Sequence, residues 1–185
     1  MVLTKKMTYD AFRYMEIPDG DTSIYELING NIMRRACPHS IHQIVQSNLM
    51  RQIGNFVFDK QLGRVLGAPL DVVFSDEDNV QPDVFFIKHD REKIIEWDGP
   101  VWGSPDLIVE IISKGTGKND RIGKFQLYEK FGVHEYWLVD PSIQTVEVYS
   151  LENGKYVLKQ FEEIEGVIKS IILIDFELNL NSIFN

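Results

Sequence analysis

The chain contains one cysteine, Cys37, among 185 residues. A single thiol excludes an internal disulfide framework and a cysteine-rich zinc site, and it fits a reducing compartment. No apolar run approaches the roughly 20 residues that span a bilayer. Residues 1–8 lack the apolar core of a signal peptide. We therefore expect a cytoplasmic protein with no membrane partner.

Positive charge is also scarce, since 19 Lys and Arg face 28 Asp and Glu and give a formal net charge of −9. This balance argues against a broad surface that coats nucleic acid, because phosphate binding depends on Lys and Arg. The sequence still concentrates basic residues in one short segment. The segment contains Lys114, Lys118, Arg121, Lys124 and Lys130. It predicts either a local basic patch that contacts DNA or a solvated loop and helix face.

Two common catalytic motifs are missing. There is no complete Gly-rich phosphate loop and no Ser-centred nucleophile elbow. The apolar content is nevertheless high, with 44% hydrophobic and 11% aromatic residues. A chain of this size and composition can bury a sizeable core. We expect residues 1–185 to form a single domain.

The pattern of apolar residues predicts a mixed α/β architecture. Thr8 caps a short helix to about Met15, and Asn29-Gly30-Asn31 joins the two strands of a hairpin. Apolar residues at helical spacing indicate a long amphipathic helix over 40–60. A second helix, capped by Asn119 or Asp120, runs to about Phe131 and is stopped by Gly132. Strands are expected at 65–66, 70–74, 84–87, 107–112, 135–139, 146–149 and 155–158. An acidic turn follows Phe74, 88–104 is a loop with at most one helical turn, and the tail over 167–184 is short strands and turns. This order favours a central mixed sheet flanked by helices over regular βαβ winding.

Two carboxylates stand beside apolar strands that should be buried. Asp83 precedes the strand over 84–87, and Glu110 interrupts the strand over 107–112. A buried charge costs several kcal/mol unless it is paired or binds a metal. A hard divalent cation shared by Asp83 and Glu110 is the leading interpretation, with the backbone carbonyl of Ile111 as a further ligand.

A lysine on the following helix extends this pattern. Asp120, Lys124 and Tyr128 recur every four residues and share one helix face. Because this helix directly follows the strand of Glu110, Lys124 can reach back over the acids. Such a lysine orients a water or neutralises charge in phosphodiester hydrolysis. Glu26, in an otherwise apolar hairpin strand, is a further candidate acid.

Each candidate also has a purely structural interpretation. Asp83 can form a turn, and Glu110 can pair with a buried arginine. Lys124 and Asp120 can form a surface helix pair, and Tyr128 can be core packing. Glu26 can pair with Arg34 or Arg35 across its hairpin. His42 can cap the long helix or serve as a partner at the site.

The ordered motifs resemble one known family. They are Tyr25-Glu26-Leu27-Ile28-Asn29-Gly30, His42, Gln81-Pro82-Asp83-Val84, residues 105–113 around Glu110, then Asp120, Lys124, Tyr128 and residues 132–141. From about residue 8 to the C-terminus the chain is similar to the Uma family of restriction-endonuclease-like proteins in the PD-(D/E)xK nuclease superfamily. The resemblance implies a restriction-endonuclease-like core with acids at one sheet edge that bind Mg²⁺, or Mn²⁺ as a substitute.

The resemblance also implies roles for individual residues. Asp83 matches the first acid of the superfamily, Glu110 the second, and Glu26 an acid from the N-terminal part. Lys124 matches a lysine that has moved from the strand to the helix. Ile112 stands where an Asp…Glu-x-Lys nuclease carries its lysine, and this is a departure from the pattern.

The leading hypothesis is a Mg²⁺-dependent endonuclease that hydrolyses DNA phosphodiester bonds. The alternative is a catalytically silent binding or scaffold protein with the same fold. A homodimer is expected, because cutting a duplex requires two cleavages and because Trp97 and Trp102 are candidates for an exposed contact.

Overall fold

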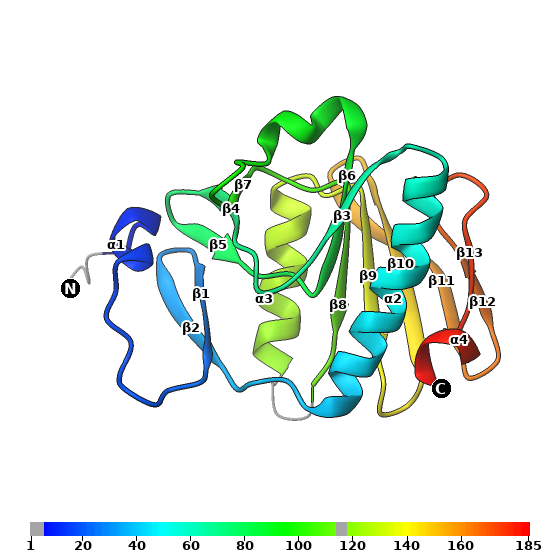
Figure 1. The fold of residues 1–185 in the computed structure, drawn as a ribbon, viewed down its shortest axis with the longest axis horizontal. Helices are drawn as coiled ribbons and strands as arrows, with labels where there is room; N and C mark the ends of the chain where they lie inside the picture. The colour runs from blue at the N-terminus through cyan, green and yellow to red at the C-terminus, as the bar shows by residue number, and fades with distance from the viewer. Residues whose placement is uncertain (1–5, 114–117) are drawn as a thin grey trace.

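The computed structural model describes residues 6–113 and 118–185, with the side chains of 118–121 not included. A central sheet of six strands runs in the order β11-β10-β9-β8-β6-β3 (Figure 1). Its strands are β3 (Gly63–Leu66), β6 (Val84–Lys88), β8 (Leu107–Ile111), β9 (Glu135–Asp140), β10 (Thr145–Glu152) and β11 (Lys155–Glu163). Within this sheet β8 and β9 are parallel, and the other neighbouring strands that the structure describes are antiparallel. The predicted central mixed sheet is therefore confirmed.

Two helices cover opposite faces of this sheet. They are α2 (Ser40–Asp59) and α3 (Lys118–Lys130). Alternation along the strands assigns the side chains to the two faces. Phe86, Val109 and Trp137 belong to the core formed with α2. Their neighbours Phe85, Ile108 and Tyr136 belong to the core formed with α3. Glu110 shares the α3 side with Ile108, so its carboxylate faces that helix.

A second sheet of five strands adjoins the first, in the order β2-β1-β5-β4-β7. Its strands are β1 (Ile24–Ile28), β2 (Asn31–Arg35), β4 (Val72–Ser75), β5 (Asp78–Val80) and β7 (Val101–Trp102). The predicted hairpin is confirmed, because Asn29 and Gly30 take φ values of 50° and 72°, as a tight hairpin turn requires. The first helix, α1 (Tyr9–Arg13), is capped by Thr8 as expected.

The remaining elements complete the chain. They are the 3₁₀ helix η1 (His89–Ile94), β12 (Val167–Lys169), β13 (Glu177–Asn179) and α4 (Asn181–Phe184). Glu135, on β9, ties this C-terminal region to the central sheet, since its carboxylate accepts hydrogen bonds from Ser170 Oγ and from the backbone of Ile171 and Ile172. No helix in the described part of the chain is long and apolar enough to cross a membrane.

Three local predictions need correction. The acidic turn after Phe74 contains β5, which is three residues long and sits between β1 and β4. The loop over 88–104 holds both η1 and β7. The tail ends in the short helix α4. The five-stranded sheet that β5 completes has no counterpart in the sequence-based prediction.

Candidate active site

The register of β6 and β8 brings the two predicted acids together. These strands are antiparallel, and Val84 lies opposite Val109. Asp83 immediately precedes β6, and Glu110 follows Val109 in β8, so both lie one residue beyond this pair in the same direction. Antiparallel pairing therefore sets the two carboxylates on neighbouring strands at one end of the central sheet. Asp83 is 3% exposed and Glu110 is 6% exposed.

Glu110 is held from helix α3. Lys124 Nζ lies 2.9 Å from Glu110 Oε1 and 3.1 Å from Oε2. The hydroxyl of Tyr128, one turn further along α3, donates to Oε1. Burial raises the pKa of Glu110 above its ordinary value of 4.5, even though Lys124 opposes that shift. Burial and the nearby Glu110 carboxylate also raise the pKa of Tyr128.

Asp83 is held from helix α2. Its Oδ2 accepts a hydrogen bond from the backbone N–H of Ile111 at 2.7 Å and lies 3.2 Å from His42 Nε2. Gln46, one turn after His42, donates to the backbone carbonyl of Asp83 at 2.8 Å. Burial alone would raise the pKa of Asp83, but the hydrogen bond and attraction from His42, together with Lys124, lower it below 3.8.

Glu26 closes the cluster from the hairpin. Its Oε1 lies 2.8 Å from Lys124 Nζ and accepts hydrogen bonds from Gln81 N at 2.9 Å and from Arg35 at 3.0 Å. Burial would lower the pKa of Arg35, but the charges of Glu26, Glu110 and Asp83 outweigh this and raise it. Lys124 thus joins two acids that come from different sheets.

The cluster gathers three carboxylates, which are ligands for a divalent cation. Asp83, Glu110 and Glu26 face Lys124, Arg35 and the His42 ring. The contacts of the Asp83 carboxylate with Ile111 and His42 both involve Oδ2. Carboxylate oxygens are the ligands that Mg²⁺ prefers. The donor chemistry therefore fits Mg²⁺, although no preformed group of three metal-ligating side chains occurs within residues 6–113 and 118–185.

The structure places all four predicted catalytic residues in this one cluster. Arg35, left open as a partner of Glu26, is that partner. Lys124 is 5% exposed and its ammonium is enclosed by acids, so it belongs to the buried cluster and not to an exposed basic surface. Lys114 lies outside the described residues, and so do the side chains of Lys118, Asp120 and Arg121.

Three further residues contact the acids. Tyr128, expected on the helix face of Lys124 or in the core, is both buried and hydrogen-bonded to Glu110. Of the two roles expected for His42, the structure shows the partner of Asp83, because the N-cap is His39, and the sequence-based prediction gave no role to Gln46. A signal for the last two exists, because His42 and Gln46 are polar residues four positions apart among the apolar positions of α2 that face the core.

Comparison with solved structures first shows which fold the chain has. The chain superposes on the crystal structure of "a putative nuclease belonging to DUF820 from Anabaena variabilis ATCC 29413" with a TM-score of 0.76 and 22% sequence identity. The superposition covers 96% of this chain and 97% of the other. At this identity the likeness shows a shared fold.

Sequence comparison then gives the family. Residues 10–181 match the Uma2 model, whose description is "Putative restriction endonuclease". The chain belongs to this family, and the resemblance drawn from its motifs is confirmed. A search of curated proteins gave no match.

Proposed function

We propose that the protein is a Mg²⁺-dependent endonuclease that hydrolyses DNA phosphodiester bonds. The observation that carries the proposal is the buried cluster in which Lys124 lies between Glu26 and Glu110, next to Asp83. Burying acids and a lysine is costly even when they are paired, and such clusters of perturbed titratable groups are common at active sites. Membership of a family described as restriction endonucleases supports the same reaction class.

Asp83, Glu110 and the Ile111 carbonyl are the groups that would hold the ion. Bound Mg²⁺ would relieve charge on the phosphate and lower the pKa of a water. Lys124 Nζ already has two carboxylate neighbours, so its position is fixed before substrate arrives. From there it would orient the attacking water or neutralise negative charge on the phosphate. Glu26 and Arg35 act as positioning residues, because both bind the assembly from the hairpin side.

Plasmid cleavage tests this proposal. Wild-type protein with Mg²⁺ or Mn²⁺ should convert supercoiled DNA to nicked and linear forms. Lys124→Met should lower the rate by about 10²-fold or more, the usual effect of losing one charge-stabilising group. Lys130→Met is the matched control, because Lys130 lies on the same helix, is more than half exposed, and pairs with Asp78 away from the cluster. Wild-type protein that cleaves no substrate with either metal would refute the proposal.

A catalytically silent binding protein remains the second candidate. It is favoured by the complete pairing of Glu110, whose two oxygens contact Lys124 and Tyr128, and by Ile112 in place of the strand lysine. In that case the cluster would only maintain the fold. Mg²⁺ would then neither raise the melting temperature nor support cleavage.

A further inference from the structure

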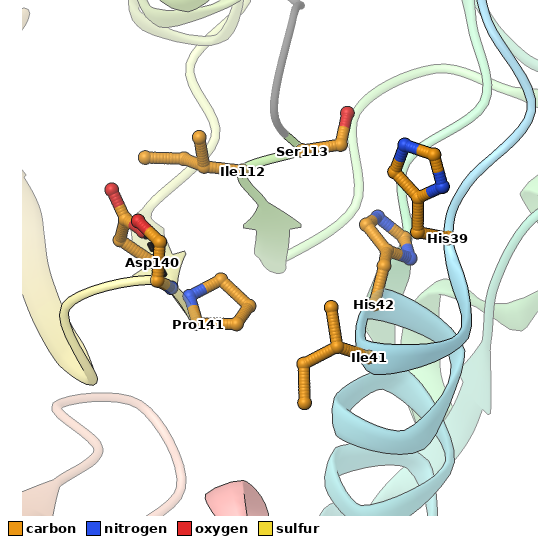
Figure 2. A pocket seen from close by; sticks show the side chains of 8 residues that line it. His39, Ile41, His42, Ile112, Ser113, Asp140 and Pro141 are labelled. Atoms are coloured by element: carbon orange, nitrogen blue, oxygen red, sulfur yellow. Dashed lines mark hydrogen bonds between the residues drawn. The ribbon is translucent and has the colours of Figure 1, made fainter.

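A pocket of about 450 Å³ opens beside the acid cluster. It lies where β8 and β9 end and α2 begins (Figure 2). Its lining residues are His39, Ile41, His42, Ile112, Ser113, Asp140, Pro141 and Ser142. Its volume is in the range of small-molecule sites. The crevice at the carboxyl ends of parallel strands is also a common place for ligands in α/β proteins.

The start of α2 is suited to an anion. The first N–H groups of a helix have no acceptor within the helix, and the helix dipole makes this end positive. Here the side chain of the N-cap residue, His39, makes no capping hydrogen bond, and the first turn contains no acidic residue. The twenty-residue α2 therefore begins with unsatisfied donors at the edge of the pocket. Phosphate groups bind at such helix ends.

A second, independent feature of the pocket is an unpartnered imidazole nitrogen. His42 is 3% exposed, and its ring forms part of the pocket wall. Nε2 lies 3.2 Å from Asp83 Oδ2. Nδ1 is buried and has no hydrogen-bond partner among the described residues. Leaving such an atom unpaired is costly, and a hydrogen bond with a ligand would satisfy it.

The remaining walls suit a flat apolar group. Ile41 is 47% exposed although it is aliphatic, and Ile112 and Pro141 face it across the pocket in Figure 2. Asp140 adds an acceptor, although one of its oxygens is already used by Ser142. The pocket thus offers donors for an anion, acceptors for N–H or O–H groups, and apolar surface between them. A nucleotide carries all three complementary features.

We infer that this pocket binds one nucleotide of the DNA strand, next to the phosphodiester that is cleaved. The nucleotide's phosphate lies at the first turn of α2, and its sugar and base lie against Ile41, Ile112 and Pro141. This inference rests on the proposed nuclease function. His42 links the two sites, because it contacts Asp83 with one nitrogen and lines the pocket with the same ring.

The principal test changes the charge at the start of α2. His39→Asp supplies the missing cap and places a carboxylate where the phosphate binds. We expect a higher melting temperature together with at least a fivefold increase in Kd for a fluorescein-labelled DNA duplex in EDTA, measured by anisotropy. Asn55→Asp adds the same charge to the same helix about 24 Å further along, and should leave Kd within twofold of wild type. Equal affinity of wild type and His39→Asp would overturn the inference.

A steric variant gives a second test without a change of charge. Ile41→Trp fills the pocket, whereas Ile44→Trp changes an equally exposed isoleucine on the same helix that does not line it. Only Ile41→Trp should weaken binding of the duplex. Equal effects of the two variants would count against the pocket.

A small probe separates failure of this inference from failure of the nuclease proposal. Thymidine 5′-monophosphate should shift the imidazole NMR signals of His42 saturably in wild type, and less in His39→Asp. Inorganic phosphate and thymidine alone should each bind more weakly than the nucleotide. If DNA is cleaved but the nucleotide shifts nothing, the pocket inference fails and the nuclease survives. If the nucleotide binds but nothing is cleaved, the nuclease proposal fails and the pocket survives.

Discussion

The contacts of Glu110 bear most directly on whether the acid cluster is catalytic or only structural. It is buried, it is paired with Lys124, and its pKa is raised by burial. Lys124 keeps a second partner in Glu26, so losing Glu110 leaves the ammonium paired. This arrangement lets a metal compete for Glu110 without leaving the lysine unpaired.

Thermal melting of Glu110→Ala, with and without Mn²⁺, tests whether Glu110 binds the metal. Wild type should be stabilised by Mn²⁺ by about 2.7 kcal/mol at a concentration 100 times the dissociation constant. Glu110→Ala should lose most of this stabilisation while it still folds without metal. The matched control is Glu129→Ala, on the same helix as Lys124 but paired with the exposed Lys155. An identical Mn²⁺ response in wild type and Glu110→Ala would exclude Glu110 as a ligand.

Glu135 shows that a buried acid in this fold can instead be structural. Its carboxylate accepts hydrogen bonds from Trp137, from Ser170 and from two backbone N–H groups that follow Ser170. In Glu135→Gln, an amide N–H₂ replaces one acceptor oxygen and faces these donors. We expect a loss of about 1–3 kcal/mol of unfolding free energy in urea denaturation, without loss of nuclease activity. Unchanged stability would contradict the role of Glu135 as an anchor.

Glu135 also makes the stability of the folded protein depend on pH. Burial raises the pKa of Glu135 above its ordinary 4.5, although the surrounding hydrogen bonds oppose the shift. The folded state then binds the proton more tightly than the unfolded state. The resulting stabilisation is complete below pH 4.5 and is lost as pH rises through the folded pKa. Urea titrations from pH 4 to 7 should show this decline in wild type and a smaller one in Glu135→Gln.

At the scale of elements, the loop that follows β3 packs against the backbone of Asp83. A Cβ on Gly67 would lie 2.3 Å from the carbonyl oxygen of Asp83, which Gln46 also binds. Gly67→Ala must therefore displace this backbone or the loop. We expect it to destabilise the protein and to lower the cleavage rate.

Gly54→Ala is the matched control for Gly67→Ala. Gly54 lies within α2, and a Cβ there would meet nothing within 4 Å. Alanine should stabilise the helix by about 0.5–1 kcal/mol and leave cleavage unchanged. Melting curves and cleavage rates for both variants are needed. Normal activity of Gly67→Ala would show that the carbonyl of Asp83 does not require this loop.

The elements that sequence reasoning recovered are those with strong local signals. Asn29-Gly30 fixes its hairpin because both residues adopt positive φ. Helix α2 follows from its apolar spacing, and the approach of Asp83 to Glu110 follows from pairing of neighbouring strands. Lys124 could be inferred because α3 comes directly after β8.

The features that were missed depend on tertiary contacts. Strand β5 is only three residues long and contains Asp78 and Asn79, which have low strand propensity, so its pairing with β1 and β4 decides its conformation. The contact of His42 with Asp83 joins residues 41 positions apart on different elements. The spacing of residues within one helix or strand does not predict such a contact between elements.

At the scale of the whole molecule, the net charge of −9 should limit DNA binding. Lys124 is enclosed by acids and does not add to a basic surface. We expect the slope of log K against log salt to be shallower than about −4, corresponding to only a few phosphate contacts. The slope is obtained by measuring duplex binding at salt concentrations between about 50 and 200 mM. A slope near −8 would indicate a broad basic face.

Dimerisation stays a prediction at this scale. Trp97 is 96% exposed, which is unusually high for tryptophan. Trp102 is 46% exposed, and its indole N–H donates a hydrogen bond to Glu96. If Trp97 lies in a dimer contact, Trp97→Ser should convert a dimer to a monomer in light scattering without lowering the melting temperature. A wild-type monomer at micromolar concentration would contradict the prediction.

The central claim is that Asp83 and Glu110 hold one divalent ion. An anomalous difference map from crystals soaked in Mn²⁺ tests it most directly. The account predicts one peak within coordination distance of both carboxylates, close to the Ile111 carbonyl, with Lys124 still bound to Glu26. A map without a peak there, in which Lys124 remains on Glu110, would contradict it.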